Sequence, residues 1–333
     1  MTGVQQKIVA KDEAEIRLDR WFKRHFPELT HGRLEKLLRT GQVRIDGKRA
    51  KASERLAAGQ TIRIPPLGTA PPASERPEKP RMRYDADDAK YLKSMVLYED
   101  DDVIVVDKPA GLPVQGGTKS ERNLDALLDY LRGKHEERPR LVHRLDRDTS
   151  GVLLLARSAS VAARLGIEFR ERTTKKIYWA LTAGAPTLSH GTIDIPVAKI
   201  MGSAGERMIA VDDTDEDDGL DTKRAITKFK VMERAGGLVT WLALMPLTGR
   251  THQLRVHLAA IGIPIVGDGK YGGSKAFVSD LPRQLHLHSR RLIVPHPRKG
   301  TIDVTAELPE HMRKSFDLFG FNANDRSDPF ARD

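Results

Sequence analysis

The sequence predicts an α+β protein with a mostly antiparallel sheet in its main body and a smaller α/β unit ahead of it. Two observations support this fold class. From residue 95 onward, short strand-like apolar runs outnumber helical ones, and a segment rich in proline and charge, residues 66–94, divides the chain. A length of 333 residues with 39% hydrophobic content suffices for two units, one of them with a sizeable core.

The first unit is expected to span residues 16–65. Apolar side chains recur at helical spacing in residues 18–26 and again in residues 34–38, which predicts two short helices. Asp46 and Gly47 then stand between alternating residues, a pattern typical of a type I′ hairpin turn. The unit therefore pairs two helices with a small sheet.

Positive charge is concentrated in this first unit. The chain carries a net charge of +10, and residues 16–65 hold 13 lysines and arginines against five acidic residues. Arg33, Lys36 and Arg39 recur on the face of the second helix that the leucines leave free. Such a stripe can follow the phosphates of RNA, although a solvated helix face has the same pattern. The stretch resembles the S4 RNA-binding domain.

Beyond the expected linker, residues 66–94, the main body is predicted to cover residues 95–320, followed by a disordered tail, residues 321–333. An acidic segment, residues 212–221, is expected to be a solvated loop. The predicted strands of the body are residues 103–108, 151–156, 176–184, 226–233 and 238–247, and the predicted helices are residues 159–172 and 253–262.

Composition also narrows the chemistry and the compartment. The absence of cysteine excludes disulfides, thiolate catalysis and cysteine-ligated metal sites. The N-terminus lacks an apolar stretch of signal-peptide length, and no apolar run is long enough to span a bilayer. We therefore expect a cytoplasmic protein that acts away from membranes, with an anionic partner such as RNA.

Three polar clusters stand at the ends of predicted strands: "HRLDRDTSG" (143–151), "KKIYWALTAG" (175–184) and "LTGRTHQLRVH" (247–257). In the first, Asp146 lies just ahead of a strongly apolar strand. A carboxylate in that position is costly unless its ionised form is stabilised, so it is either a paired structural residue or a group kept charged for chemistry.

Together and in this order, the clusters resemble the RluA-type family of pseudouridine synthases, especially members that modify large-subunit ribosomal RNA. "YEDDDVIVVDKPAGLPV" before the clusters, and "IPIVGDGKYGG" and "LHLHSRRLIVPHP" after them, also match the family's layout. The resemblance covers residues 95–312. It implies isomerisation of uridine to pseudouridine in RNA, with no cofactor and no metal, and we expect the enzyme to be a monomer.

By this resemblance, Asp146 is the catalytic carboxylate, either attacking the ribose C1′ or acting as a base on the sugar. Arg255 is expected to pair with it and keep it ionised, and Arg250 to support it or bind phosphate. Tyr178 is expected to stack on the target uracil. Arg144 either enters the RNA helix when the target nucleotide is flipped out or contacts a phosphate.

Other readings use the same residues differently. His286 and His288 share one face of a strand and His252 and His257 lie near Arg255, so a metal-dependent hydrolase is conceivable, although five residues separate the second pair. A non-enzymatic RNA-binding ribosome assembly factor is a further alternative. A glycosidase is disfavoured because no second catalytic carboxylate is evident.

Overall fold

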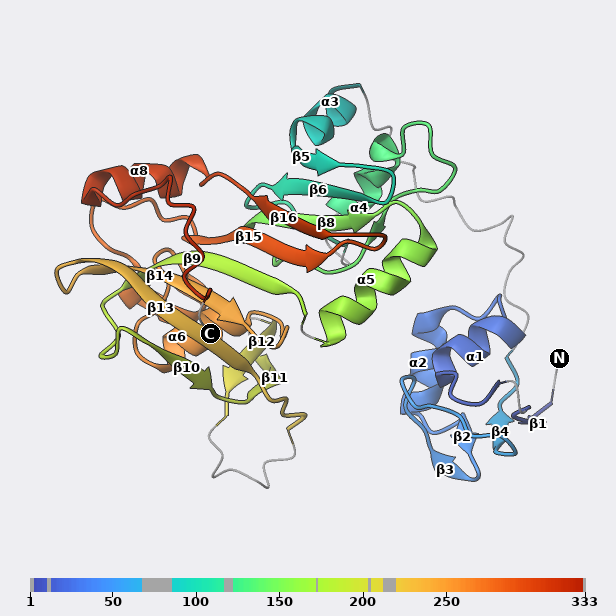
Figure 1. Ribbon diagram of the computed structural model, residues 1–333. Coiled ribbons are helices and arrows are strands. Elements are labelled where there is room, and N and C mark those ends of the chain that lie inside the picture. Colours follow the sequence, from blue (N-terminus) through green and yellow to red (C-terminus); the bar gives the residue numbers. More distant parts are fainter. Residues whose placement is uncertain are drawn as a thin grey trace. The chain divides into compact units, whose positions relative to one another are not determined.

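The computed structural model describes residues 3–10, 13–67, 86–116, 122–171, 173–202, 205–211 and 220–331 (Figure 1). The chain divides into two compact units, Met1–Arg83 and Tyr84–Asp333, each with its own hydrophobic core. Within the described residues, every helix falls short of the length and apolarity needed to cross a membrane.

The first unit packs two helices on a small sheet. Its elements are β1 (Gln5–Ile8), α1 (Leu18–His25), α2 (His31–Arg39), β2 (Arg44–Ile45), β3 (Lys48–Arg49) and β4 (Thr61–Ile64), with strand order β1-β4-β2-β3. Asp46 and Gly47 have φ angles of 48° and 77°, the left-handed values that a type I′ turn requires at both central positions, so the predicted hairpin is confirmed. The unit begins earlier than residue 16, because β1 pairs with β4.

The helix faces of this unit are divided as the periodicity predicted. Trp21 and Phe22 of α1 and Leu34 and Leu38 of α2 are buried in one core. Arg33, Lys36 and Arg39 are exposed on the opposite side of α2. The basic stripe is therefore accessible to a partner.

The second unit is built on one large mixed sheet. The strand order is β10-β13-β14-β9-β15-β8-β6-β5, with β16 paired to β15 and β7 to β8. Among these described strands, β15 and β8 pair in parallel and the other pairings are antiparallel, so the predicted fold class is confirmed. These strands are β5 (Val96–Glu99), β6 (Val103–Lys108), β7 (Arg140–Leu141), β8 (Ser150–Ala156), β9 (Lys175–Ala183), β10 (His190–Asp194), β13 (Ile226–Ala235), β14 (Val239–Pro246), β15 (Leu287–Pro295) and β16 (Thr301–Thr305). A separate hairpin consists of β11 (Val197–Gly202) and β12 (Gly205–Ala210).

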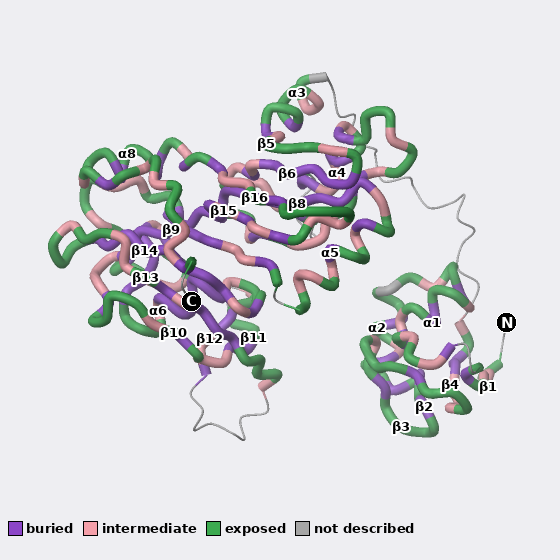
Figure 2. The backbone as a smooth tube through the Cα atoms, viewed as in Figure 1, coloured by how far each residue is buried: buried purple, intermediate pink, exposed green. Residues whose placement is uncertain are grey.

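Helices cover both faces of this sheet (Figure 1). The helices of this unit are α3 (Ala86–Ser94), α4 (Leu124–Leu127), η3 (Leu128–Leu131), α5 (Ala159–Glu171), α6 (Gln253–Ala260), α7 (Gly269–Gly272), η4 (Gly273–Ala276) and α8 (Glu310–Phe319). The core against one face includes α3, α4 and α6, and the cores against the other face include α5 and α8. Figure 2 shows the central strands, such as β8 and β14, as continuous buried segments.

Two further predicted boundaries are wrong. Residues 86–94 are not linker but helix α3, whose Leu92 is fully buried in the core of the second unit. Residues 321–331 are not a disordered tail, because Phe330 is buried in the α8 core and Lys175 donates to Asp328 at 2.9 Å. In both cases, contacts with distant strands order a segment whose local composition is polar. Residues 212–219 of the predicted acidic loop lie outside the described residues.

Candidate active site

The loop that carries Asp146 joins β7 to β8 and is held from behind by Lys108. The Lys108 Nζ donates to the backbone oxygens of Pro109, Leu112 and Arg147 at 2.8, 2.9 and 2.9 Å, and Gly111 N donates to the Arg147 oxygen at 2.9 Å. Burial lowers the pKa of Lys108 to about 8, while nearby aspartates, Asp146 included, act in the opposite direction. The amine therefore stays charged at neutral pH and fixes the loop.

Asp146 itself is half-buried and its carboxylate is open. Among the described residues, none donates a hydrogen bond to that carboxylate or forms an ion pair with it; the neighbouring Asp148 pairs with Arg147 instead, at 3.8 Å. A carboxylate held by its backbone while its oxygens remain free is suited to react with a substrate rather than to stabilise the fold.

Tyr178 of β9 faces the same space as Asp146. Its ring belongs to the core on one face of the sheet, whereas Ile177 and Trp179 belong to the core on the other face, because successive side chains of a strand point to opposite faces. Burial, and after it the negative charge of Asp146, raises the pKa of the Tyr178 phenol above its ordinary value. The hydroxyl is therefore protonated at neutral pH.

The turn before α6 brings Arg250 to the cleft, and Gln253 organises that turn. The Gln253 Oε1 accepts from Thr248 Oγ1 at 2.7 Å and from Arg250 N at 3.0 Å, while its Nε2 donates to Ile226 O at 2.9 Å and to Thr227 Oγ1 at 3.0 Å. Every hydrogen-bonding group of this buried amide has a partner, so the turn is rigid.

The sequence predicted that Arg255 of α6 pairs with Asp146. In the structure it pairs with Asp268 instead. Its Nε donates to Asp268 Oδ2 at 2.8 Å and its Nη2 donates to Asp268 Oδ1 at 2.7 Å, with both side chains buried. Asp146 still acts on Arg255 through its charge: burial lowers the pKa of Arg255, and Asp268 and then Asp146 raise it. The physical reason is that a buried guanidinium takes the partner that meets it with two parallel hydrogen bonds.

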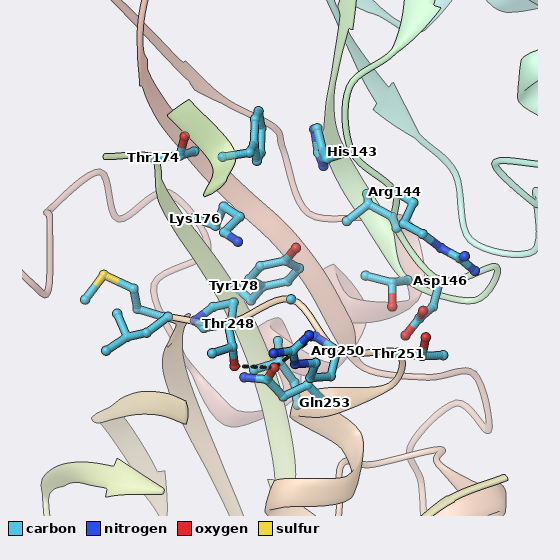
Figure 3. Close-up of a pocket in the computed structure, with 18 of the residues that line it drawn as sticks. His143, Arg144, Asp146, Thr174, Lys176, Tyr178, Thr248, Arg250, Thr251 and Gln253 are labelled. Atoms are coloured by element: carbon cyan, nitrogen blue, oxygen red, sulfur yellow. Dashed lines mark hydrogen bonds between the residues drawn. The ribbon is translucent and has the colours of Figure 1, made fainter. Parts of the chain in front are cut away.

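These side chains line one cleft of about 820 Å³ (Figure 3). Among its described lining residues, Asp146 is the only carboxylate. The lining cations are Arg144, Arg170, Lys175, Lys176, Lys228, Arg250 and Arg255. Figure 3 shows Asp146, Arg144 and Tyr178 around the same space. The positive charge of the cleft thus favours a polyanion, and Asp146 is the single negative group among the described lining residues.

The structure unites five of the predicted site residues and separates the rest. Arg144, Asp146, Tyr178, Arg250 and Arg255 all line the cleft, whereas the basic stripe of α2 belongs to the other unit. Sequence reasoning missed Asp268 as the partner of Arg255. The available signal was the "GDG" within "IPIVGDGKYGG", where two glycines surround a single acidic residue.

His143 also lines the cleft, and the sequence analysis assigned it no role. Its ring stacks on Phe169 with centroids 4.7 Å apart, and its Nε2 accepts from Leu154 N at 2.9 Å. Burial lowers the pKa of His143 to about 3. The imidazole is therefore neutral and carries its proton on Nδ1.

The histidines considered for a metal site have other partners. His286 Nε2 contacts Ser315 Oγ at 2.8 Å and His288 Nδ1 contacts Ser150 Oγ at 2.8 Å. His257 Nε2 contacts the Ile195 oxygen at 2.9 Å. Within the part of the chain that the structure describes, no group of three or more histidines and carboxylates could hold a metal ion. The hydrolase hypothesis therefore has no ligand set there.

A basic cleft that holds a buried tyrosine, and a single carboxylate among its described lining residues, is suited to an enzyme that acts on a polyanionic substrate. The family model described as RNA pseudouridylate synthase matches residues 102–260. Ribosomal large subunit pseudouridine synthase C of Rickettsia typhi is 35% identical over 88% of this chain and 94% of its own length. RNA pseudouridine synthase 4, mitochondrial, of Arabidopsis thaliana is 34% identical over 92% of this chain and 80% of its own length.

Solved structures agree. The human RNA pseudouridylate synthase domain containing 4 superposes with a TM-score of 0.56 and 30% sequence identity, covering 70% of this chain and 95% of that protein. The chain belongs to the RNA pseudouridylate synthase family. It is accordingly an isomerase that converts uridine to pseudouridine in RNA. This finding contradicts the alternative of a non-enzymatic RNA-binding factor.

Proposed function

We propose that this enzyme modifies uridines of large-subunit ribosomal RNA and that Asp146 is its catalytic carboxylate. The observation that carries the catalytic role is the free carboxylate of Asp146, the only one among the described residues of a basic cleft. The substrate is supported by the bacterial relatives, which are named for the large ribosomal subunit. A cytoplasmic site of action is supported by the same relatives, although the Arabidopsis relative is named mitochondrial.

The chemistry breaks the bond from C1′ to N1 of uracil, turns the base and forms a bond from C1′ to C5, with the C5 proton lost and N1 protonated. An ionised Asp146 either attacks C1′ or removes a proton from the sugar, and its charge stabilises positive charge at C1′ in the first route. Tyr178, protonated beside Asp146, stacks on the base and lies near the proton that leaves C5.

Two arginines complete the proposed site. Arg255 places a fixed positive charge near Asp146, whose negative charge helps to raise the pKa of the arginine. Arg144 is exposed at the edge of the cleft, two residues before Asp146, and occupies the space of the flipped nucleotide or binds its phosphate.

The Arg255→Ala variant should lower turnover roughly 10²- to 10³-fold, with RNA binding nearly unchanged, because the side chain is buried and stabilises charge rather than phosphate. The Arg255→Lys variant should recover little, since an ammonium lacks the planar fork. Single-turnover tritium release from RNA labelled at uracil C5, with an RNA binding titration, measures both effects. An active Arg255→Ala protein beside an inactive Arg250→Ala protein would assign the role to Arg250 instead.

The first unit, by its likeness to S4 domains and its exposed basic stripe, supplies RNA affinity. Removing residues 1–83 should weaken binding while turnover on a short, saturating substrate persists, because none of the cleft residues belongs to that unit. Replacing Arg33, Lys36 and Arg39 by alanine should reduce the slope of log affinity against log salt by up to about three, roughly one for each lost phosphate contact. An unchanged salt slope in both proteins would refute this role.

A further inference from the structure

We propose that Ser289 is a positioning residue for the isomerisation: its hydroxyl holds the phenol of Tyr178 and keeps the phenol oxygen directed at the target uracil. Ser289 acts through Tyr178, so the inference rests on the proposed role of that residue. It starts from the sheet, in which β15 lies between β9, which carries Tyr178, and β8, which follows the Asp146 loop (Figure 1).

Strand pairing places Ser289 directly opposite Tyr178. The two are Cα partners in the antiparallel pair of β15 and β9, and the partner of Ser289 on the other side is Gly151 of β8. Directly opposed residues of antiparallel strands have their side chains on the same face, with Cβ atoms about 4.5–5.5 Å apart. A Cβ on Gly151 would lie 2.2 Å from the Ser289 oxygen, so β8 runs very close to β15 at this point.

The hydroxyl of Ser289 is buried and its proton is already in use. The residue is 3% exposed, and its Oγ donates to the Val152 oxygen of β8 at 3.2 Å. A serine hydroxyl has one proton and can also accept. With that proton on Val152, the Ser289 oxygen is left to accept from the protonated phenol. A chain from Tyr178 through Ser289 to Val152 then ties the phenol to the strand behind the Asp146 loop.

The electrostatics of Tyr178 also involve this contact. Burial and then the charge of Asp146 raise the pKa of the phenol, and the side-chain hydrogen bond with Ser289 lowers it. The lowering arises because a serine hydroxyl that turns toward an ionised phenol donates to it and stabilises its negative charge. Ser289 can therefore hold the phenol oxygen in either protonation state.

A β-bulge fixes the direction of Ser289. The register of β15 against β9 shifts just after Ser289, where Arg290 is the extra residue. Bulges of this kind re-aim side chains and are frequent next to active sites. Arg290 is 2% exposed, its guanidinium carbon lies 4.3 Å from the Trp179 ring centroid, and its Nη2 donates to the Ala323 oxygen at 3.2 Å. The orientation of Ser289 toward Tyr178 is thus set by the fold.

The phenol needs such a hold because Asp146 also attracts its proton. A phenol that donated to Asp146 would occupy one of the oxygens that must react. A phenol whose proton is directed to Ser289 leaves those oxygens open and presents its own oxygen to the cleft, where the C5 proton leaves. Tyr178 is among the described lining residues of the cleft and Ser289 is not, so Ser289 acts from behind.

The test is the Ser289→Ala variant, assayed with RNA that carries hydrogen or deuterium at uracil C5. We expect kcat to fall about tenfold, the size of one hydrogen bond lost from the transition state, with KM changed less than about twofold. Deuterium should slow single-turnover product formation by this variant about twofold or more, because departure of the C5 hydrogen then limits the rate. A normal kcat, or a slower variant without an isotope effect, would overturn the proposal.

A double-mutant cycle with Tyr178→Phe, which removes the phenol oxygen and keeps the ring, tests the connection between the two residues. In the Tyr178→Phe background, Ser289→Ala should change single-turnover rates by less than about twofold. Losses that multiply would mean that Ser289 acts on the fold and not through the phenol, against the proposal. Normal turnover by Tyr178→Phe alone would instead overturn the proposed role of the Tyr178 hydroxyl, which is a different result.

Ser315 of α8 offers a matched control. It is 1% exposed, its Oγ contacts His286 Nε2 at 2.8 Å and donates to the His311 oxygen at 3.1 Å, and it is not among the described lining residues of the cleft. Ser315→Ala should leave kcat within about twofold of wild type, whatever stability it loses. Thermal unfolding is measured on every preparation. If Ser289→Ala does not fold, Ser289→Cys takes its place with the same expected isotope effect, because a thiol is only a weak donor and acceptor.

Discussion

The Asp146→Asn variant should bind RNA and unfold at the same temperature as wild type, yet form pseudouridine at least about 10⁴-fold more slowly, a loss of the size seen when a catalytic group is removed. The amide keeps the shape of the side chain but lacks the negative charge needed to attack C1′ or take a proton. Folding should be unaffected because, among the described residues, the carboxylate has no hydrogen bond to lose. Tritium release from RNA labelled at uracil C5 measures the rate.

The control for this variant is two residues away. Asp148 lies in the same loop, is exposed, and its carboxylate contacts Arg147 at 3.8 Å at the surface. Asp148→Asn removes the same charge at nearly the same place in the chain, so it should keep turnover within about twofold. Equal losses in the two variants would mean that the net charge of the loop matters rather than the reactivity of Asp146. Turnover by Asp146→Asn within about tenfold of wild type, a barrier change of only ~1.4 kcal/mol, would refute the catalytic role.

The strands of the second unit could be predicted because their sequences carry the evidence locally. β8 and β14 are continuous apolar runs buried along their whole length, and β9 alternates between the two faces. Helix α3 escaped prediction because Leu92 is the only buried apolar side chain among those described in it, so its sequence is typical of a polar linker. Its position depends on packing against η3 and α4 rather than on local pattern.

The order of residues 321–331 depends in the same way on distant partners. Arg290 donates to the backbone oxygens of Ala323 and Asp325, and Lys175 donates to Asp328 and to the Phe330 oxygen. The segment "NANDRSDP" shows none of this, because the arginine and the lysine stand 33 or more residues away in the chain. Tertiary contacts override composition here.

The site was predictable in its residues but not in all its pairings. Asp146 stood out as a carboxylate just ahead of a buried strand, and Tyr178 as a member of the second polar cluster. Both Asp146 and Asp268 were available to Arg255, one of them 13 residues away. Only the fold decides which carboxylate meets the guanidinium with two oxygens at once, because that choice depends on the direction of α6 relative to the loop before α7.

Gly151→Ala should cause a large loss of stability in the second unit, although it adds a single methyl group. Gly151 has φ +107° and lies at the start of β8, between Lys108 of β6 and Ser289 of β15. A Cβ there would lie 2.2 Å from the Ser289 oxygen and 2.8 Å from its carbon and nitrogen. All three are backbone atoms of a central strand and cannot move aside as a side chain can.

Backbone strain of about 1–3 kcal/mol and overpacking of a similar size should together lower the free energy of unfolding by roughly 3 kcal/mol or more. The shift of β8 would also displace the attached Asp146 loop, so turnover should fall in the protein that remains folded. Urea unfolding followed by the fluorescence of Trp179 and Trp241, both buried in the second unit, measures the loss. Trp21 is replaced by phenylalanine in every protein compared, so that the first unit does not contribute.

Gly133→Ala separates the two causes. Gly133 also has a positive φ, 59°, but its Cβ would meet nothing within 4 Å. It should cost only about 1–2 kcal/mol, the free energy of a left-handed conformation in a residue with a side chain. If Gly151→Ala were no more destabilising than Gly133→Ala, the close approach of β8 to Ser289 would not restrict this position.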